Sequence, residues 1–377
     1  MAEQRYTHYV RSKPHRVMKE TATENKAPAA PSPNEAHALD AGLRYAHPAD
    51  PGITRQGCKA DGFTYRHPSG KPVRDAATLE RIRKLAIPPG YTDVWICPDP
   101  QGHLQATGRD ARGRLQYRYH LNWRQVRDED KFSRMLAFAK ALPDLRAQLE
   151  ADLKPPGLPK EKVLATVILL LQRTYIRIGN DAYEKENKSY GLTTLKDKHA
   201  FIEGRQIKLS FKGKSGVRHS ITLSDARLAR IIKKCQDLPG QQLFQYLGPD
   251  GSLAAIGSAD VNQYLKQAMS GPFTAKDFRT WAGTLLCCQY LDSLARLAEG
   301  PLTQKHVADT IKQVAACLGN TPAVCKKSYI HPAVFTAYQG GGHKPDVMLI
   351  ANVDMPGLTP EEARLVAWLE GLAALNG

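Results

Sequence analysis

Residues 205–223 read RQIKLSFKGKSGVRHSITL, and this stretch decides the fold of the region around it. Apolar and polar side chains alternate over Arg205–Phe211 and again over Arg218–Leu223, as they do in half-buried β-strands. The segment between them, Lys212–Gly216, contains two glycines, which favour a tight turn. The sequence therefore predicts a β-hairpin with basic residues, among them Lys214, at its tip.

Helical patterns surround this hairpin on both sides. Helices are predicted at residues 130–149, 159–175, 225–235, 260–269, 274–298 and 304–318. The apolar side of 159–175 is nearly continuous, which is typical of a helix deep in a core. Residues 126–377 are thus expected to form a larger, mainly α domain with a small β-hairpin sheet. The segment after Tyr329, with a final helix at about 359–375, is expected to pack over the helix that carries Tyr329.

Residues 42–125 show a different pattern. Short β-like pieces at 63–65, 94–97 and 104–107 are separated by Gly and Pro turns, and one helix is expected to begin after Asp75 as its N-cap. This predicts a small N-terminal β-sheet domain with helices, so that the whole chain is of the α+β class. Residues 1–41 contain few apolar side chains, and we expect a disordered basic tail there.

The charge of the chain limits its partners. Lys and Arg number 53 against 37 Asp and Glu, a formal charge of +16 spread along the sequence, which favours a broad polyanion footprint. Charge alone does not separate DNA from RNA, anionic lipid or ribosome. The longest apolar run, Val163–Leu171, is too short to span a bilayer, and the start lacks the apolar segment of a signal peptide. We expect a soluble, intracellular protein with no membrane partner.

The seven cysteines form no C-x-x-C pair and no zinc-type group with histidine. They are expected to be reduced thiols, and the sequence predicts no metal site.

Residues 318–329 read LGNTPAVCKKSY and predict a short helix, with Thr321 as N-cap and Pro322 at the first helical position. Tyr329 follows about two turns further on, next to two lysines, in a position to meet a phosphate. A tyrosine on a basic amphipathic helix is usually packed, so this residue alone is a weak signal.

Its partners change that interpretation. Arg177, Lys214, Arg279, Asn320 and Tyr329 occur in this order, and the order resembles the active-site series of type IB DNA topoisomerases, in particular the compact poxvirus-like enzymes also found in bacteria. The resemblance covers roughly residues 42–335 and includes ATGRDARGRLQYRY at 106–119, which is similar to the DNA-clamp signature of that family. It implies a catalytic domain of the type IB topoisomerase/tyrosine recombinase kind.

By this resemblance Tyr329 is the nucleophile, Arg177 and Arg279 hold the scissile phosphate, and Lys214 donates a proton to the departing 5′ oxygen. The chemistry is reasonable in itself, because two guanidiniums present forked donors to the charge that develops on the phosphate. A lysine can protonate a poor alkoxide leaving group. The resemblance therefore implies catalysis with no metal, nucleotide or other cofactor.

Two further positions belong to this implied site. Lys276 lies three residues before Arg279, on the same helical face, and is implied to assist proton delivery or contact phosphate; the alternative is a surface lysine. Asn320 stands where many members of the broader family carry histidine. Asparagine can donate a hydrogen bond but cannot be charged.

The N-terminal domain supplies the implied DNA contacts. Tyr117 and Tyr119 alternate on a strand, so that both rings face one side. The resemblance implies that they contact phosphate and that Gln116 reads a base edge, with plain strand packing as the alternative. Further DNA contacts are implied for Arg109, Arg114 and Tyr183.

The implied activity is relaxation of positive and negative supercoils through a 3′-phosphotyrosyl intermediate, by a monomer that closes as a clamp around duplex DNA. The expected location is the bacterial cytoplasm, at the nucleoid. A tyrosine recombinase is one alternative, although these enzymes usually carry histidine where Lys276 stands. A non-enzymatic DNA-binding protein is the other, and it leaves the series of five residues unexplained.

Overall fold

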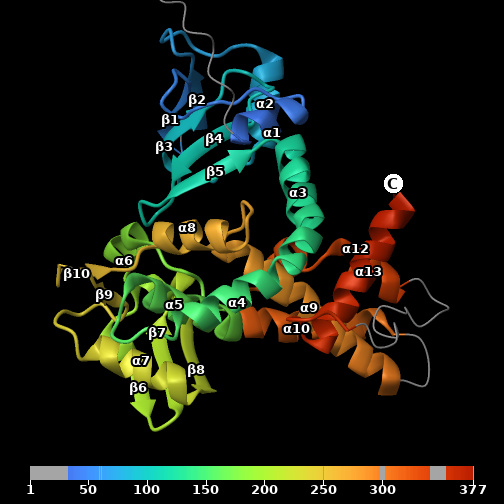
Figure 1. Ribbon diagram of the computed structural model, residues 1–377. Helices are drawn as coiled ribbons and strands as arrows, with labels where there is room; N and C mark the ends of the chain where they lie inside the picture. Colours follow the sequence, from blue (N-terminus) through green and yellow to red (C-terminus); the bar gives the residue numbers. More distant parts are fainter. Residues whose placement is uncertain are drawn as a thin grey trace, which may run out of the picture. The chain divides into compact units, whose positions relative to one another are not determined.

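A computed structural model describes residues 33–58, 60, 62–248, 250–297, 302–339 and 354–376 (Figure 1). The chain divides into two compact units, Met1–Val126 and Arg127–Gly377. The first unit is built around an antiparallel sheet, and helices dominate the second. The α+β class and the mainly α catalytic core expected from the sequence are confirmed.

The first unit contains one five-stranded sheet in the order β2-β1-β3-β4-β5, with every neighbouring pair antiparallel. Its elements are α1 (Pro33–Asp40), β1 (Ile53–Cys58), β2 (Gly62–Arg66), α2 (Ala76–Lys84), β3 (Thr92–Ile96), β4 (Leu104–Arg109) and β5 (Leu115–Tyr119). Asp75 caps α2 as predicted, since its carboxylate accepts from the Thr78 N–H at 2.7 Å. Ile82 of α2 packs with Ile53 and Ile96 of the sheet.

The structure corrects the prediction of a disordered N-terminal tail at the end of that segment. Most of residues 1–41 lie outside the described residues, but Pro33–Asp40 forms the helix α1 instead of a disordered segment. Ala38 is fully buried and shares a small cluster with Leu43 and Trp123. Because its partner Trp123 lies far along the chain, the helix depends on a contact that local composition does not reveal.

The second unit is a helical body with a small sheet. Its helices are α3 (Leu121–Lys140), α4 (Leu142–Asp152), α5 (Lys160–Thr174), α6 (Asp181–Asn187), α7 (Ala226–Gln236), α8 (Ser258–Ala268), α9 (Ala275–Leu297), α10 (Gln304–Leu318), α11 (Pro322–Ser328), α12 (Pro332–Gln339) and α13 (Pro360–Asn376). The strands are β6 (Ala200–Glu203), β7 (Gln206–Lys212) and β8 (Arg218–Ser224) in one antiparallel sheet, and β9 (Gln245–Leu247) with β10 (Leu253–Ala255) in another. α3 begins just before the boundary between the units.

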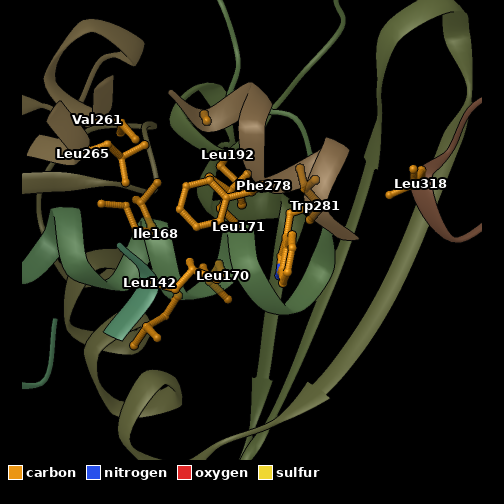
Figure 2. Close-up of a cluster of buried hydrophobic side chains, with 14 of the residues drawn as sticks. Leu142, Ile168, Leu170, Leu171, Leu192, Val261, Leu265, Phe278, Trp281 and Leu318 are labelled. Carbon is orange, nitrogen blue, oxygen red and sulfur yellow. The ribbon is translucent and has the colours of Figure 1, made fainter. Parts of the chain in front are cut away.

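The helix α5 lies in the core of this unit, as its continuous apolar side predicts. Its residues 163–171 are all buried, which is the pattern of a helix surrounded by protein. Figure 2 shows Ile168, Leu170 and Leu171 of α5 among side chains from other elements. These neighbours come from α4, α8 and α9, among other elements, and include Leu142, Leu265 and Phe278.

The single helix predicted at 130–149 is two helices. The chain breaks between α3 and α4, where Leu142 begins α4 and Pro143 occupies its first turn. Proline has no N–H to donate inside a helix but fits the first turn, where that donor has no partner anyway. The proline therefore marks a restart and not a helix interior.

The predicted hairpin is confirmed. β7 and β8 pair in register from Gln206 opposite Ser224 to Lys212 opposite Arg218. Between them a short 3₁₀ turn, Lys214–Gly216, forms the tip, and Ser215 adopts a positive φ of 62° there. The order of residues at 205–223 thus places Lys214 at the tip of the hairpin.

Candidate active site

Tyr329 lies at the C-terminal end of α11. Thr321 caps this helix by accepting from the Val324 N–H at 3.4 Å, and Pro322 is in its first turn, both as predicted. The Tyr329 N–H donates to the Cys325 carbonyl at 2.9 Å, which ends the helix at this residue. Its side chain is half-buried.

The backbone of Tyr329 rests directly on α9. A β-carbon at Gly283 would lie 2.5 Å from the Tyr329 carbonyl oxygen, closer than real atoms approach, so only glycine fits there. The Thr284 hydroxyl donates to the same oxygen at 3.3 Å and accepts from the His331 N–H at 3.0 Å. These contacts fix the chain on both sides of the tyrosine.

Arg279 lies one helical turn before Gly283 and is 4% exposed. Its guanidinium carbon is 5.0 Å from the centre of the Tyr329 ring. One Nη donates to the Tyr175 carbonyl and the other to the Leu318 carbonyl at 2.7 Å, so the side chain joins the ends of α5 and α10. Tyr175 adopts a positive φ of 56° where α5 ends.

The charge of Arg279 has no carboxylate counter-ion in the described parts of the chain. Its Nε is buried and has no hydrogen-bond partner among those residues. A buried cation without a counter-ion is costly, and an anion at this place offsets the cost. The arrangement is therefore suited to an anionic ligand.

Arg177 and Asn320 meet in a second contact. Arg177 donates through Nη2 to the Asn320 side-chain oxygen and through Nη1 to the Gly319 carbonyl at 3.4 Å. Gly319 ends α10 in the left-handed conformation, φ 58°, and the Asn320 N–H bonds back to the Ala315 carbonyl at 2.9 Å. The Asn320 Nδ2 is buried without a partner in the described residues, so this amide still has donors to offer.

Positive charge around Tyr329 alters its acidity. Burial by itself raises the pKa of the phenol, but the charges of Arg279, Arg177 and Lys276 act in the other direction, and the net pKa is lowered. Burial also lowers the pKa of Arg279, and the neighbouring Arg177 lowers it further. The site thus makes it easier for Tyr329 to lose its proton than for an ordinary tyrosine, and the phenolate is the better nucleophile.

The two lysines differ from the arginines in exposure. Lys276 is exposed near the start of α9 and is close enough to influence Tyr329 electrostatically. Lys214 is exposed at the hairpin tip, and the contacts of the described residues do not join it to Tyr329 or either arginine. The structure brings together four of the five residues in the series and leaves Lys214 at the margin.

Two of the predicted DNA-contact residues of the first unit, Arg114 and Gln116, bind the side chain of Asp110. Its carboxylate accepts from Arg114 Nε at 2.8 Å and from Gln116 Nε2 at 3.0 Å. The hydrogen bond with the Arg114 side chain is the main reason that the pKa of Asp110 falls to about 2. Asp110 therefore fixes both predicted contact residues, a role that the sequence did not show.

The neighbouring contacts follow the predicted strand geometry. Tyr117 and Tyr119 of β5 lie on one face, with their rings stacked at a centroid distance of 6.0 Å and an angle of 10°. Tyr117 is 46% exposed, so its ring is open to a ligand. Arg109 donates to the Gly113 carbonyl at 2.8 Å. Tyr183 belongs to α6, and its side chain lies outside the described residues.

Gly283 and Thr284 are the site residues that the sequence analysis missed. A signal was available for Gly283 alone, since a residue four positions after Arg279 on a helix lies on the same face. In the parts of the chain that the structure describes, no group of three or more His, Cys, Asp and Glu side chains could hold a metal ion. None of the described helices is long and apolar enough to cross a membrane.

The chain resembles known proteins in both units. Residues 120–344 match the family model described as eukaryotic DNA topoisomerase I, catalytic core, and residues 62–110 match bacterial DNA topoisomerase IB, N-terminal domain. DNA topoisomerase 1B of Acanthamoeba polyphaga mimivirus is 35% identical over 286 residues, which cover 74% of this chain and 85% of the viral protein. DNA topoisomerase 1B of vaccinia virus, strain Western Reserve, is 27% identical over 265 residues, covering 68% of this chain and 80% of its own.

Proposed function

The chain belongs to the type IB DNA topoisomerase family, and from that premise we propose that Tyr329 is the nucleophile that cuts and reseals one strand of duplex DNA. The observation that carries this assignment is the buried Arg279 beneath the Tyr329 ring, without a carboxylate counter-ion in the described residues. Membership of the family decides against the tyrosine recombinase and the non-enzymatic DNA-binding protein as alternatives.

In the proposed cleavage step the Tyr329 oxygen attacks the phosphorus and the bond from phosphorus to the 5′ oxygen breaks. The phenol proton passes to solvent, which the lowered pKa of Tyr329 favours. The phosphate remains joined to the 3′ end of the cut strand as a phosphotyrosyl ester. Religation is the reverse reaction, so the energy of the phosphodiester bond is conserved and ATP has no part in the step.

Charge on the phosphate is met by Arg177, Arg279 and Asn320. Arg279 Nε and Asn320 Nδ2 are donors without partners in the described residues, so each can bond a phosphate oxygen without breaking an existing contact. Donors held in place before the reaction lower the barrier more than donors that must reorganise. Because fixed guanidiniums supply this stabilisation, we propose that the reaction proceeds without a metal ion.

Lys214 is the proposed acid that protonates the 5′ oxygen. Its place at the tip of a hairpin suits a side chain that reaches a DNA strand, and its exposure leaves it free to move. Lys276 is proposed to assist at the phosphate, since its charge already acts on Tyr329.

In the first unit, Tyr117 and Tyr119 are proposed to contact phosphates, together with Arg109 and Arg114. Tyr183 of α6, in the second unit, is also proposed to contact DNA. The Gln116 amide nitrogen is held by Asp110, so its oxygen is the group left to accept from a base edge. We further propose a monomer that closes as a clamp on DNA, in the bacterial cytoplasm.

The test is to trap the covalent complex. Cleavage of a nicked duplex in chelator without ATP is stopped with denaturant, and the DNA-linked peptide is identified by mass spectrometry. The expected peptide contains Tyr329, and supercoiled plasmid of either sign is relaxed under the same conditions. Linkage at another residue, or an absolute need for added magnesium, would contradict the proposal. Tyr246→Phe, a change on β9, serves as the matched control.

A further inference from the structure

His219 lies between the turn that carries Lys214 and the turn that carries Asn320. It belongs to β8, opposite Phe211 of β7, and the two rings stack with their centres 5.0 Å apart and an angle of 16° between them. The hairpin itself thus fixes the plane of the imidazole. Neither the sequence motifs nor the proposed reaction gives this residue a role.

The first turn against the ring is that of Gly213, directly before Lys214. A β-carbon at Gly213 would lie 2.7 Å from both Cδ2 and Nε2 of His219. The φ of Gly213 is −92°, which any residue can adopt, so glycine is needed here for space and not for backbone conformation. The imidazole therefore fills the place that a side chain at this position would occupy.

The second turn is that of Gly319, directly before Asn320. A β-carbon at Gly319 would lie 2.4 Å from Cε1 of His219. The carbonyl of Gly319 accepts from Arg177, so the same turn also holds one of the two arginines. One half-buried ring thus separates two loops that lie about one hundred residues apart in the sequence.

The surroundings of the ring keep it uncharged. Burial lowers the pKa of His219, and the charges of Arg177 and Arg279 lower it further. A group with a lowered pKa is neutral at neutral pH and gains its proton only at more acidic pH. The ring therefore adds no third positive charge beside the two arginines, and it acts through its shape.

We propose that His219 is a positioning residue that sets the Lys214 turn at a fixed distance from the Asn320 turn. The inference rests on the proposed acid role of Lys214. Through this spacer the exposed lysine acquires a defined place relative to the phosphate-binding groups, although the described contacts do not join it to them directly. Loss of the ring leaves a gap between two glycines that only a backbone shift can close.

The experiment compares two substrates in single-turnover cleavage. One duplex has the normal 5′ oxygen at the scissile phosphate, and the other has sulfur there, a better leaving group that needs no proton. His219→Ala is expected to cleave the oxygen substrate at least roughly 10-fold more slowly than wild type, and the sulfur substrate at a nearly normal rate. His219→Phe, which can still stack on Phe211 and fill the gap, is expected to stay within a few-fold of wild type on both.

Several outcomes overturn the inference. A wild-type rate for His219→Ala on oxygen shows that the spacing does not matter, and an equal defect on both substrates assigns the ring to the phosphate side. A defect in His219→Phe as large as in His219→Ala shows that the imidazole nitrogens are needed. Ser220→Ala, the exposed neighbour on β8, is the control for changes in the strand.

Two further variants keep the test decisive. If His219→Ala does not fold, Gly213→Ala displaces the same turn from the other side and must show the same rescue by sulfur; a normal rate on oxygen overturns the inference. Lys214→Ala is measured in parallel. Absence of rescue in Lys214→Ala contradicts the acid role itself, whereas rescue there without rescue in His219→Ala contradicts only the positioning role.

Discussion

The two sides of the proposed site are built differently. Arg279 is buried, donates to two carbonyls and lies under the Tyr329 ring, and the backbone of that tyrosine is held by Gly283 and Thr284. Lys214 is exposed on a two-stranded tip. The difference teaches that the proposed phosphate-binding side is organised by the protein core, whereas the proposed acid projects from the exposed tip of a hairpin.

The largest effect is expected when the proposed nucleophile, Tyr329, which lies on the buried side, loses its hydroxyl. Tyr329→Phe is expected to abolish the covalent adduct, because the lost hydroxyl forms the new bond, and to leave DNA affinity within a few-fold, because the footprint is much larger than one hydroxyl. Adduct yield on a nicked duplex and binding by titration check this. An adduct that persists in the variant contradicts the assignment.

Arg279→Ala tests whether the buried side is structural as well as catalytic. Cleavage is expected to fall by roughly 10³-fold, since a charged donor to the phosphate is lost. The free energy of unfolding should also fall, by roughly 1–3 kcal/mol for each carbonyl left unpaired, at Tyr175 and Leu318. Single-turnover rates and urea denaturation measure the two effects. An unchanged free energy of unfolding would contradict the view that Arg279 is part of the packed core.

Lys214→Ala tests the exposed side. Cleavage of the oxygen substrate is expected to fall by roughly 10²-fold or more, with most of the rate restored on the sulfur substrate. The free energy of unfolding should stay within about 0.5 kcal/mol of wild type, as is usual for exposed positions. A clear loss of stability would show that the tip is part of the packed structure.

Asn320→Ala is expected to have a smaller effect, toward 10²-fold, because two arginines still meet the phosphate. Asn320→His should keep most of the activity, since an imidazole N–H can donate at a similar reach. Cleavage rates at several pH values compare the three proteins. If alanine matches wild type, Asn320 serves only the turn before Thr321 and drops out of the series.

The smallest effect is expected at Thr284. Thr284→Val removes the hydroxyl that joins the Tyr329 carbonyl to the His331 N–H, and we expect a few-fold slower cleavage and a loss of about 1–3 kcal/mol in the free energy of unfolding. Thr284→Ser keeps the hydroxyl and should restore both. A wild-type rate in Thr284→Val would show that the hydrogen bonds of this hydroxyl do not affect cleavage.

Local patterns in the sequence predicted much of this architecture. The bounds of α10, the cap at Thr321 and the hairpin around Lys214 follow from periodicity, capping chemistry and turn residues, all of which act over a few positions. The helix restart at Pro143 was missed, although its signal was local.

What the sequence could not show depends on contacts between distant residues. α1 is helical because Ala38 meets Trp123, the Asn320 oxygen is occupied by Arg177, and Gly283 is required by a carbonyl on another helix. The resemblance to type IB topoisomerases pointed to the site residues, and their chemical type is consistent with the proposed roles, which stay predictions until they are tested. The distances and contacts between these residues could be obtained only from the folded structure.

The support of Tyr329 by α9 has a mechanical consequence. In the proposed reaction Tyr329 carries the DNA end, and torque from the rotating duplex then passes through one side chain into a backbone fixed at Gly283 and Thr284. α9 in turn packs against α5, α10 and α13, so the load spreads into the body of the unit. In the proposed reaction the attached strand end is thereby held as a fixed pivot while the free 5′ end turns, so that the 5′ hydroxyl meets the phosphate at the same place after each rotation.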